Sequence, residues 1–260
     1  MDNLRIYGKP PFKVAVIHGG PGASGEMAPV ARELSSIAGV LEPFQTAKTI
    51  EGQINELKDV LKAEANPPVA LIGWSWGAWL SFLFTARHPK LVKKLILIGS
   101  GPFEEKYASD IMNIRLNRLS EEEKEEVLLL KKTLENAAIL DKNAVMARFG
   151  QLISKADSYG PMSFQSELLE CQYDIYQNIW EQAMKLRSQK KLLAFGKEIQ
   201  CPVLAIHGDY DPHPYEGVQQ PLSRILKDFR FILLEKCGHK PWIERSTKEI
   251  FYKILKREVD

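Results

Sequence analysis

Short apolar runs alternate with longer amphipathic patterns along most of the chain. The runs are rich in valine, isoleucine and leucine, and they cover residues 12–17, 69–72, 94–98, 203–206 and 229–234. Continuous apolar runs are typical of buried parallel strands, because helices cover both faces of such a sheet. A weaker strand is expected over residues 39–44.

Helical patterns fill the gaps between these runs, at about residues 29–36, 50–64, 77–87, 221–227 and 247–257. Strands that alternate with helices over short connections predict a doubly wound sheet. We therefore expect an α/β fold with a mainly parallel sheet of about six strands.

One long segment interrupts the alternation. Between residues 102 and 196 the chain has helical patterns and no clear strand. Ser120 and Glu123 have capping-box spacing before a leucine-rich run, and Asp141 could cap a second helix toward Phe149. Residues 163–187 are expected to form one long amphipathic helix, or two. We predict a helical cap over 102–196, inserted into an α/β core made of residues 1–101 and 197–260.

Composition excludes several classes of protein. The 260 residues include 35 basic and 33 acidic side chains, a net charge of +2, without the basic patch that nucleic acid or membrane binding needs. No run approaches the roughly 18 apolar residues of a membrane span. The three cysteines, Cys171, Cys201 and Cys237, are far apart, which indicates reduced thiols of a cytoplasmic protein. No metal or cofactor is expected, a small molecule is the expected partner, and the oligomeric state stays open.

Candidate chemistry lies where the predicted strands end, which is where ligands bind in open α/β sheets. The second run ends in Gly73-Trp74-Ser75-Trp76-Gly77, just before a helical pattern. This spacing is typical of a sharp turn that holds a nucleophilic serine outward, although a buried turn without chemistry has the same pattern. Such a serine needs a base and a group that orients the base. Asp211 and His239 follow later strands in the order Ser, Asp, His.

With these motifs the whole chain resembles the α/β-hydrolase-fold serine hydrolases, and the loop His18-Gly19-Gly20-Pro21-Gly22 resembles that of the proline iminopeptidase branch. The resemblance implies that Ser75 is the nucleophile, His239 the base and Asp211 the acid. Asp209 is the weaker candidate for the acid and would hold its loop. The oxyanion-hole donors would be the backbone N–H groups of Trp76 and, from the glycine loop, Gly20.

Three further histidines and the two tryptophans of the turn lie near the predicted strand ends. His18 and His207 are expected to bond neighbouring backbone, and His213, between prolines, to serve a rigid loop. The indoles of Trp74 and Trp76 can shield the site from water, although one of them could belong to the core.

The substrate is less clearly indicated. Proline iminopeptidases carry glycine where this chain has Trp74, and the hairpin that precedes their glycine loop is expected to be largely absent here. We predict hydrolysis of a small ester or amide in an apolar pocket that includes Trp74, Glu170 and Tyr173. The alternatives are an aminopeptidase that holds the substrate ammonium with a cap carboxylate, and a non-catalytic ligand-binding protein of the same fold. The candidate carboxylates are Glu167, Glu170, Asp174 and Glu181.

Overall fold

The structure is a computed structural model that describes residues 3–136 and 138–259; the predicted domain ranges also include residues 1, 2, 137 and 260, which lie outside it. One seven-stranded sheet has the order β1-β3-β2-β4-β5-β6-β7, and every neighbouring pair is parallel except β1 and β3. The predicted α/β fold with a mainly parallel sheet is confirmed. The strands are β1 (Leu4–Tyr7), β2 (Phe12–Ile17), β3 (Gly39–Pro43), β4 (Val69–Trp74), β5 (Val92–Ile98), β6 (Val203–Gly208) and β7 (Phe229–Leu234).

The additional strand is β1, an edge strand that the sequence pattern did not predict. It pairs antiparallel with β3, from Leu4 opposite Pro43 to Tyr7 opposite Val40. It has only four residues and its Ile6 is half exposed, so it lacks the apolar run that marks the central strands. Within the described residues a single short strand precedes β2, and it pairs with β3 instead of forming a hairpin with β2.

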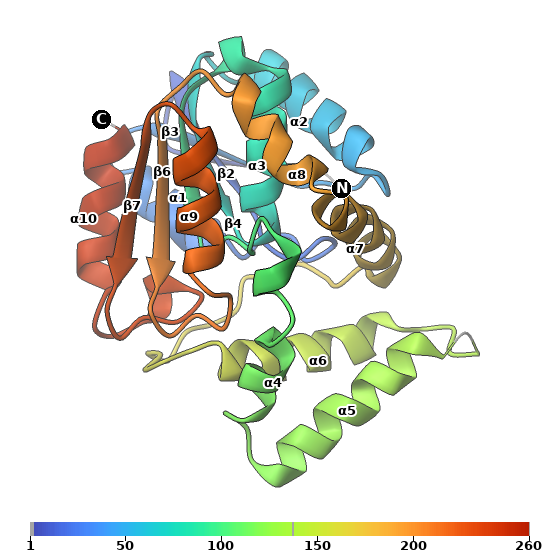
Figure 1. Ribbon diagram of the computed structural model, residues 1–260. Helices are drawn as coiled ribbons and strands as arrows, with labels where there is room; N and C mark the ends of the chain where they lie inside the picture. The colour runs from blue at the N-terminus through green and yellow to red at the C-terminus, as the bar shows by residue number, and fades with distance from the viewer. Residues whose placement is uncertain (1–2, 137, 260) are drawn as a thin grey trace.

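Two helical layers cover the sheet (Figure 1). The helices α1 (Ala28–Leu34) and α10 (Lys248–Val259) pack on one face, and α2 (Ile50–Glu64), α3 (Trp76–Arg87) and α9 (Glu216–Ile225) pack on the other. Helix α9 begins earlier than predicted, with Pro221 inside it. The carbonyl of Gly217, which loses its helical donor at Pro221, instead accepts a 2.9 Å hydrogen bond from the N–H of Phe103.

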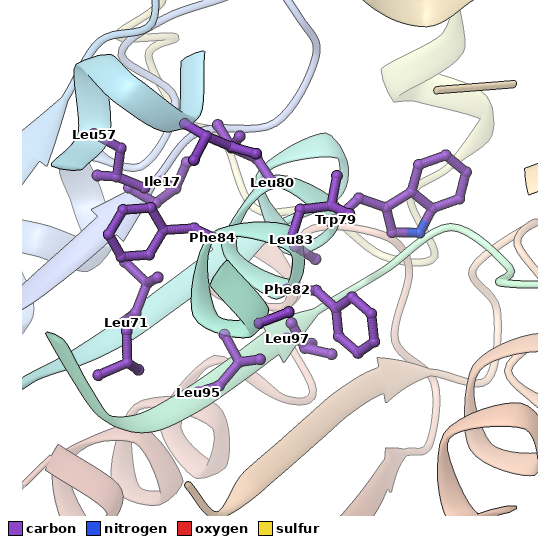
Figure 2. Packing of buried hydrophobic residues seen from close by; sticks show 14 of the residues in the cluster. Ile17, Leu57, Leu71, Trp79, Leu80, Phe82, Leu83, Phe84, Leu95 and Leu97 are labelled. Carbon is purple, nitrogen blue, oxygen red and sulfur yellow. The ribbon is translucent and has the colours of Figure 1, made fainter. Parts of the chain in front are cut away.

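Helix α3 crosses the middle of the larger core. All eleven of its residues from Trp76 to Ala86 are buried, because β4, β5 and α2 surround it. Figure 2 shows Leu80, Leu83 and Phe84 among side chains from β2, β4 and α2. This burial fixes the start of α3, and therefore the turn that contains Ser75, relative to the sheet.

Between β5 and β6 the described residues form helices and no strand element. The helices are α4 (Ile111–Leu116), α5 (Glu121–Glu135), α6 (Asn143–Ala156), α7 (Tyr173–Ser188) and α8 (Lys191–Ala194). Ser120 and Glu123 form the predicted capping box at α5. In Figure 1 the arrows of β6 and β7 point toward α4 and α6, so these helices lie beyond the carboxyl ends of the strands. Among the described helices, none is both long and apolar enough to cross a bilayer.

The helix expected over residues 163–187 begins only at Tyr173. Residues 161–172 are extended and form a segment that we call the strap. Its ends make single β-bridges, Pro161 to Glu244 and Cys171 to Ala23. The composition of the strap suits a helix, but distant carbonyls take its N–H groups: Leu169 donates to Ser24 and Gln172 donates to Gly22. Tertiary contacts therefore override local propensity here.

Candidate active site

Ser75 lies in a strained turn between β4 and α3. Its φ of 54° and ψ of −116° are rare for a residue with a side chain, and α3 begins at the next residue. The flanking glycines allow the turn: a Cβ on Gly73 would lie 2.1 Å from the carbonyl oxygen of Gly77, and one on Gly77 would lie 2.4 Å from that of His18. The turn therefore has the geometry of a nucleophile elbow.

Asp211 and His239 come together from the loops after β6 and β7. The Nδ1 atom of His239 lies 2.6 Å from Oδ2 of Asp211, and both residues are buried. Because a carboxylate can only accept, His239 donates its Nδ1 proton and leaves Nε2 free to act as a base. Gly99 gives this pair room, since a Cβ there would lie 3.0 Å from His239 Nδ1.

The second oxygen of Asp211 binds His213. Oδ1 lies 2.7 Å from His213 Nδ1 and 3.0 Å from the main-chain nitrogen of the same residue. Burial alone would raise the pKa of Asp211, but His239, His213 and His207 together hold this pKa well below its usual range. Asp211 is therefore ionised at neutral pH.

His213 also faces a cation. Burial lowers the pKa of His213 to about 4, the carboxylate of Asp211 opposes that shift, and the Arg115 guanidinium adds to it. Arg115 Nη2 lies 3.5 Å from His213 Nε2, and the guanidinium binds both oxygens of Asp157, at 2.8 and 2.7 Å. Sequence reasoning gave His213 only a loop role and missed Arg115 and Asp157. The one available signal was a histidine two residues after the acid.

The other polar residues of these loops have structural contacts. Asp209 accepts a 3.1 Å hydrogen bond from the N–H of Cys237, as expected for a residue that holds its loop. His18 donates to the carbonyl of Gly19 at 2.7 Å, and His207 donates to that of His213 at 2.8 Å. All three cysteines are buried and unpaired.

Ser75 and His239 line one cavity of about 570 Å³. Gly20, Trp74 and Trp76 line it as well, so both indoles are at the cavity although each is largely buried. Gly20 has a φ of +43°, and its N–H has no acceptor among the described residues. The N–H of Trp76, in the first turn of α3, likewise has no helical acceptor. These are the two groups expected to bind an oxyanion.

The far wall of the cavity is mainly apolar and comes from α5, α6, α7 and the strap. Its side chains include Leu134, Met146, Phe149, Ile153, Leu168, Tyr176 and Trp180. The rings of Tyr176 and Trp180 stack, and Trp180 stacks in turn on Trp79 of α3. An apolar chain could lie along this wall while a polar group faces Ser75.

The charges at the cavity occur as ion pairs. Lys240 lies 2.5 Å from Glu26, and Arg115 is bound to Asp157. None of the carboxylates expected to hold a substrate ammonium is among the described lining residues. Two of these carboxylates form ion pairs away from the cavity: Glu167 binds Arg32, and Asp174 binds Lys48.

Two predicted substrate contacts are corrected. Glu170 is exposed and bonds Gln172, and Tyr173 directs its hydroxyl to the carbonyl of Leu134 at 2.8 Å. Neither lines the cavity within the described residues. The predicted helix would have brought both residues onto one face of it, but the strap is extended and turns Glu170 outward. Trp74, the third predicted contact, lines the cavity.

Asp211, His213 and His239 offer ligand atoms within 4.8 Å of one another, a separation that a metal ion could bridge. Both histidines already use Nδ1 to bind Asp211, and the Arg115 cation lies beside His213 Nε2. This arrangement suits a hydrogen-bonded network better than a cation site.

A family model of the alpha/beta hydrolase fold matches residues 45–246, and the chain belongs to this family. The chain is similar to a Bacillus subtilis protein described as a "Putative 2-succinyl-6-hydroxy-2,4-cyclohexadiene-1-carboxylate synthase", with 24% identity over 78% of this chain and 70% of that protein. It is also similar to the pimeloyl-[acyl-carrier protein] methyl ester esterase of Neisseria meningitidis serogroup A. That match has 22% identity and covers 74% of this chain and 58% of the relative, which is less than two thirds of its length.

Solved structures resemble the whole chain. VinJ aligns with a TM-score of 0.68 and 17% identity over 98% of this chain and 93% of its own. The proline iminopeptidase of Mycobacterium smegmatis aligns with a TM-score of 0.64 and 15% identity, again over 98% and 93%. At these identities the likeness demonstrates the fold. The family and its hydrolase and esterase relatives together support a hydrolase.

Proposed function

We propose that this protein is a serine hydrolase that cleaves a carboxylic ester with an apolar acyl or alcohol part. The observation that carries the proposal is the cavity that Ser75 and His239 share, with Ser75 in a strained elbow and His239 bound to Asp211. A nucleophile, a base and an orienting acid are the three parts that acyl transfer through serine requires.

In the proposed reaction, His239 Nε2 takes the proton of Ser75 as its hydroxyl oxygen attacks the ester carbonyl. The N–H groups of Gly20 and Trp76 stabilise the negative oxygen of the tetrahedral intermediate, and each such donor lowers the barrier by about 3 kcal/mol. His239 then protonates the departing alcohol. Water attacks the acyl-serine with His239 again as base, which releases the carboxylic acid and restores Ser75.

The charges at the cavity favour an ester over an aminoacyl substrate. A bound ammonium needs a carboxylate that is free to pair with it, because an unpaired buried charge costs several kcal/mol. Glu26 and Asp157 are the carboxylates that line the cavity, and each already binds a cation. The similarity to the Neisseria methyl ester esterase agrees with this choice.

A proline iminopeptidase-like aminopeptidase is the second candidate. The His18-Gly19-Gly20-Pro21-Gly22 loop and the likeness to a solved proline iminopeptidase favour it. It would require an ammonium to displace Lys240 from Glu26 or Arg115 from Asp157.

The deciding experiment compares p-nitrophenyl butyrate and octanoate with the p-nitroanilides of proline and alanine. We expect ester turnover that is lost in Ser75→Ala, together with labelling of the wild type, but not of Ser75→Ala, by a fluorophosphonate probe. Anilide turnover that disappears when the substrate amine is acetylated would replace the esterase by the aminopeptidase. A folded wild type that neither reacts with the probe nor cleaves an ester would instead indicate a non-catalytic binding protein.

A further inference from the structure

Asp211 holds a histidine on each of its oxygens. His239 binds Oδ2, and His213 binds Oδ1 through both its ring, at 2.7 Å, and its main-chain N–H, at 3.0 Å. The two imidazole rings lie side by side, with centroids 4.8 Å apart. A serine, a base and an acid already suffice for the proposed reaction, so the ring of His213 is not accounted for by that reaction.

The contacts fix which protons His213 carries. Asp211 is ionised and can only accept, so the proton of the His213 ring is on Nδ1. Nε2 then carries a lone pair, which faces the Nη2 donor of Arg115 at 3.5 Å. The titratable and charged groups that face His213 come from two parts of the fold. His207 belongs to β6, and Asp211 and His239 belong to the loops that follow β6 and β7, whereas Arg115 and its partner Asp157 come from the cap helices.

The same contacts form a closed series of polar interactions that links the cap helices to His239. Arg115 lies on α4 and binds Asp157, which directly follows α6. The main-chain carbonyl of Asp157 accepts a 2.9 Å hydrogen bond from the N–H of His239. The path therefore runs from His239 through Asp211, His213, Arg115 and Asp157 back to His239.

We propose that His213 is a positioning residue that holds the Asp211 carboxylate toward His239, and that Arg115 and Asp157 link this carboxylate to the cap helices. The proposal rests on the proposed function, because it gives His213 a role only if Asp211 orients a catalytic base. Two donors on Oδ1 prevent the carboxylate from rotating away from His239. They also withdraw electron density from it, so the imidazolium of His239 is stabilised less than it would be beside a carboxylate without them.

The ring can be tested separately from the loop. The main-chain N–H of His213 donates to Asp211 and its carbonyl accepts from His207, and both bonds persist when the side chain changes. Asparagine can place an amide N–H where Nδ1 is now, whereas leucine fills similar space without a donor. Glutamine places its amide farther out, near the position of Nε2.

The experiment measures kcat, KM and the pH dependence of kcat/KM on a p-nitrophenyl ester for His213→Leu, His213→Asn and His213→Gln. His88→Leu is the matched control, because His88 lies at the end of α3 and does not line the cavity. We expect His213→Leu to lower kcat by roughly ten- to a hundredfold with KM nearly unchanged, since it removes a hydrogen bond to a charged group. The acid limb of its pH profile moves to higher pH, because Asp211 becomes a stronger acceptor. His213→Asn restores most of kcat.

Other outcomes overturn the proposal. A folded His213→Leu variant with the kcat and pH profile of the wild type shows that the ring positions nothing. A loss of kcat without a shift of the acid limb, which His213→Asn does not rescue, shows a purely structural role. If His213→Leu does not fold, the comparison of the Asn and Gln variants decides: equal activities contradict the proposal, and an active Asn with an impaired Gln variant supports it. A wild type without ester activity would refute the proposed function itself.

Discussion

The indole N–H of Trp74 donates a 2.9 Å hydrogen bond to the main-chain carbonyl of His239. The residue before the elbow serine therefore holds the residue that carries the proposed base, 165 positions later in the chain. The Trp74 ring also lies on Gly19, where a Cβ would come within 2.4 Å of the indole. A tryptophan at this position thus connects three loops of the site.

Trp74→Phe should impair both stability and catalysis. Phenylalanine leaves the buried carbonyl of His239 without its donor, which costs about 1–3 kcal/mol. Trp79→Phe is a matched control, because Trp79 donates to the carbonyl of Gly101 at 3.0 Å and does not line the cavity. We expect both variants to lose unfolding free energy, measured by urea denaturation, with a smaller loss for Trp79→Phe because the Gly101 carbonyl keeps the hydrogen bond from the Ser100 hydroxyl at 3.0 Å. Only Trp74→Phe should have a lower kcat. Equal kcat values would contradict the positioning of His239 by Trp74.

The two neighbouring aspartates should differ in their effect on kcat. Asp211 binds His239, whereas Asp209 binds the main chain of Cys237. Asp211→Asn places an amide against Nδ1 and favours the wrong tautomer of His239, so kcat should fall by a factor on the order of 10³–10⁴. Asp209→Asn should have a much smaller effect, and thermal melts check that both variants are folded. The reverse ranking would make Asp209 the acid.

A buried carboxyl far from the cavity gives a pH-dependent prediction. Burial raises the pKa of Glu42 from an ordinary value of 4.5 to about 7, although Tyr7 and Arg5 lower it, and Oε1 of Glu42 has no hydrogen-bond partner among the described residues. Between pH 4.5 and about pH 7 the folded state therefore binds more protons at Glu42 than the unfolded state does. The stability that protonated Glu42 contributes is complete below pH 4.5 and is lost as the pH rises through about 7.

Glu42→Gln should therefore stabilise the protein at pH 8, by about 1–3 kcal/mol, and have little effect at pH 4.5. Glutamine can still accept the hydrogen bond of the Tyr7 hydroxyl, which lies 2.9 Å from Glu42. Glu64→Gln, at the exposed end of α2, is the control and should change the unfolding free energy equally little at both pH values. A variant that is less stable than the wild type at pH 8 would show that the pair with Arg5 outweighs burial.

Glu244 should matter for the loop that carries His239. It is fully buried, and its carboxylate accepts the N–H groups of Tyr159, Gly160 and Gly238 at 2.8, 2.7 and 3.0 Å. Glu244→Gln turns an amide donor toward one of these donors, which should cost about 1.5–3 kcal/mol of stability and lower kcat. The exposed Glu249→Gln should change the unfolding free energy by less than about 0.5 kcal/mol. A Glu244 variant with wild-type stability would contradict this account.

The features of the fold that the sequence predicted correctly depend on local patterns. The apolar runs around Val69 and Val203 predict central strands because burial on both faces demands them. The expectation that Ser75, Asp211 and His239 lie close together rests on strand ends that meet at one edge of a parallel sheet. In the structure Asp211 and His239 are in contact at 2.6 Å. The sequence also placed Asp209 in a loop-holding role, which agrees with its bond to Cys237.

The features that it could not predict depend on contacts between distant residues. Arg115 and Asp157 look like solvated positions of amphipathic helices, and their pairing depends on how α4 and α6 meet. The strap has helical composition, but Gly22 and Ser24 accept its N–H groups. Periodicity reports which face of a segment is apolar and does not report which distant carbonyl takes its N–H groups.

The strap has a consequence for protein engineering. Gly22 allows the Gln172 carbonyl to come so close that a Cβ on Gly22 would lie 2.4 Å from it, and the other end of the strap is bonded to Ile243, four residues after His239. An exchange of the cap helices for those of another hydrolase would therefore disturb the glycine loop and the His239 loop if it also replaced the strap. A chimera that retains residues 157–172 and exchanges only α5 and α6 changes part of the apolar wall while these two attachments stay native.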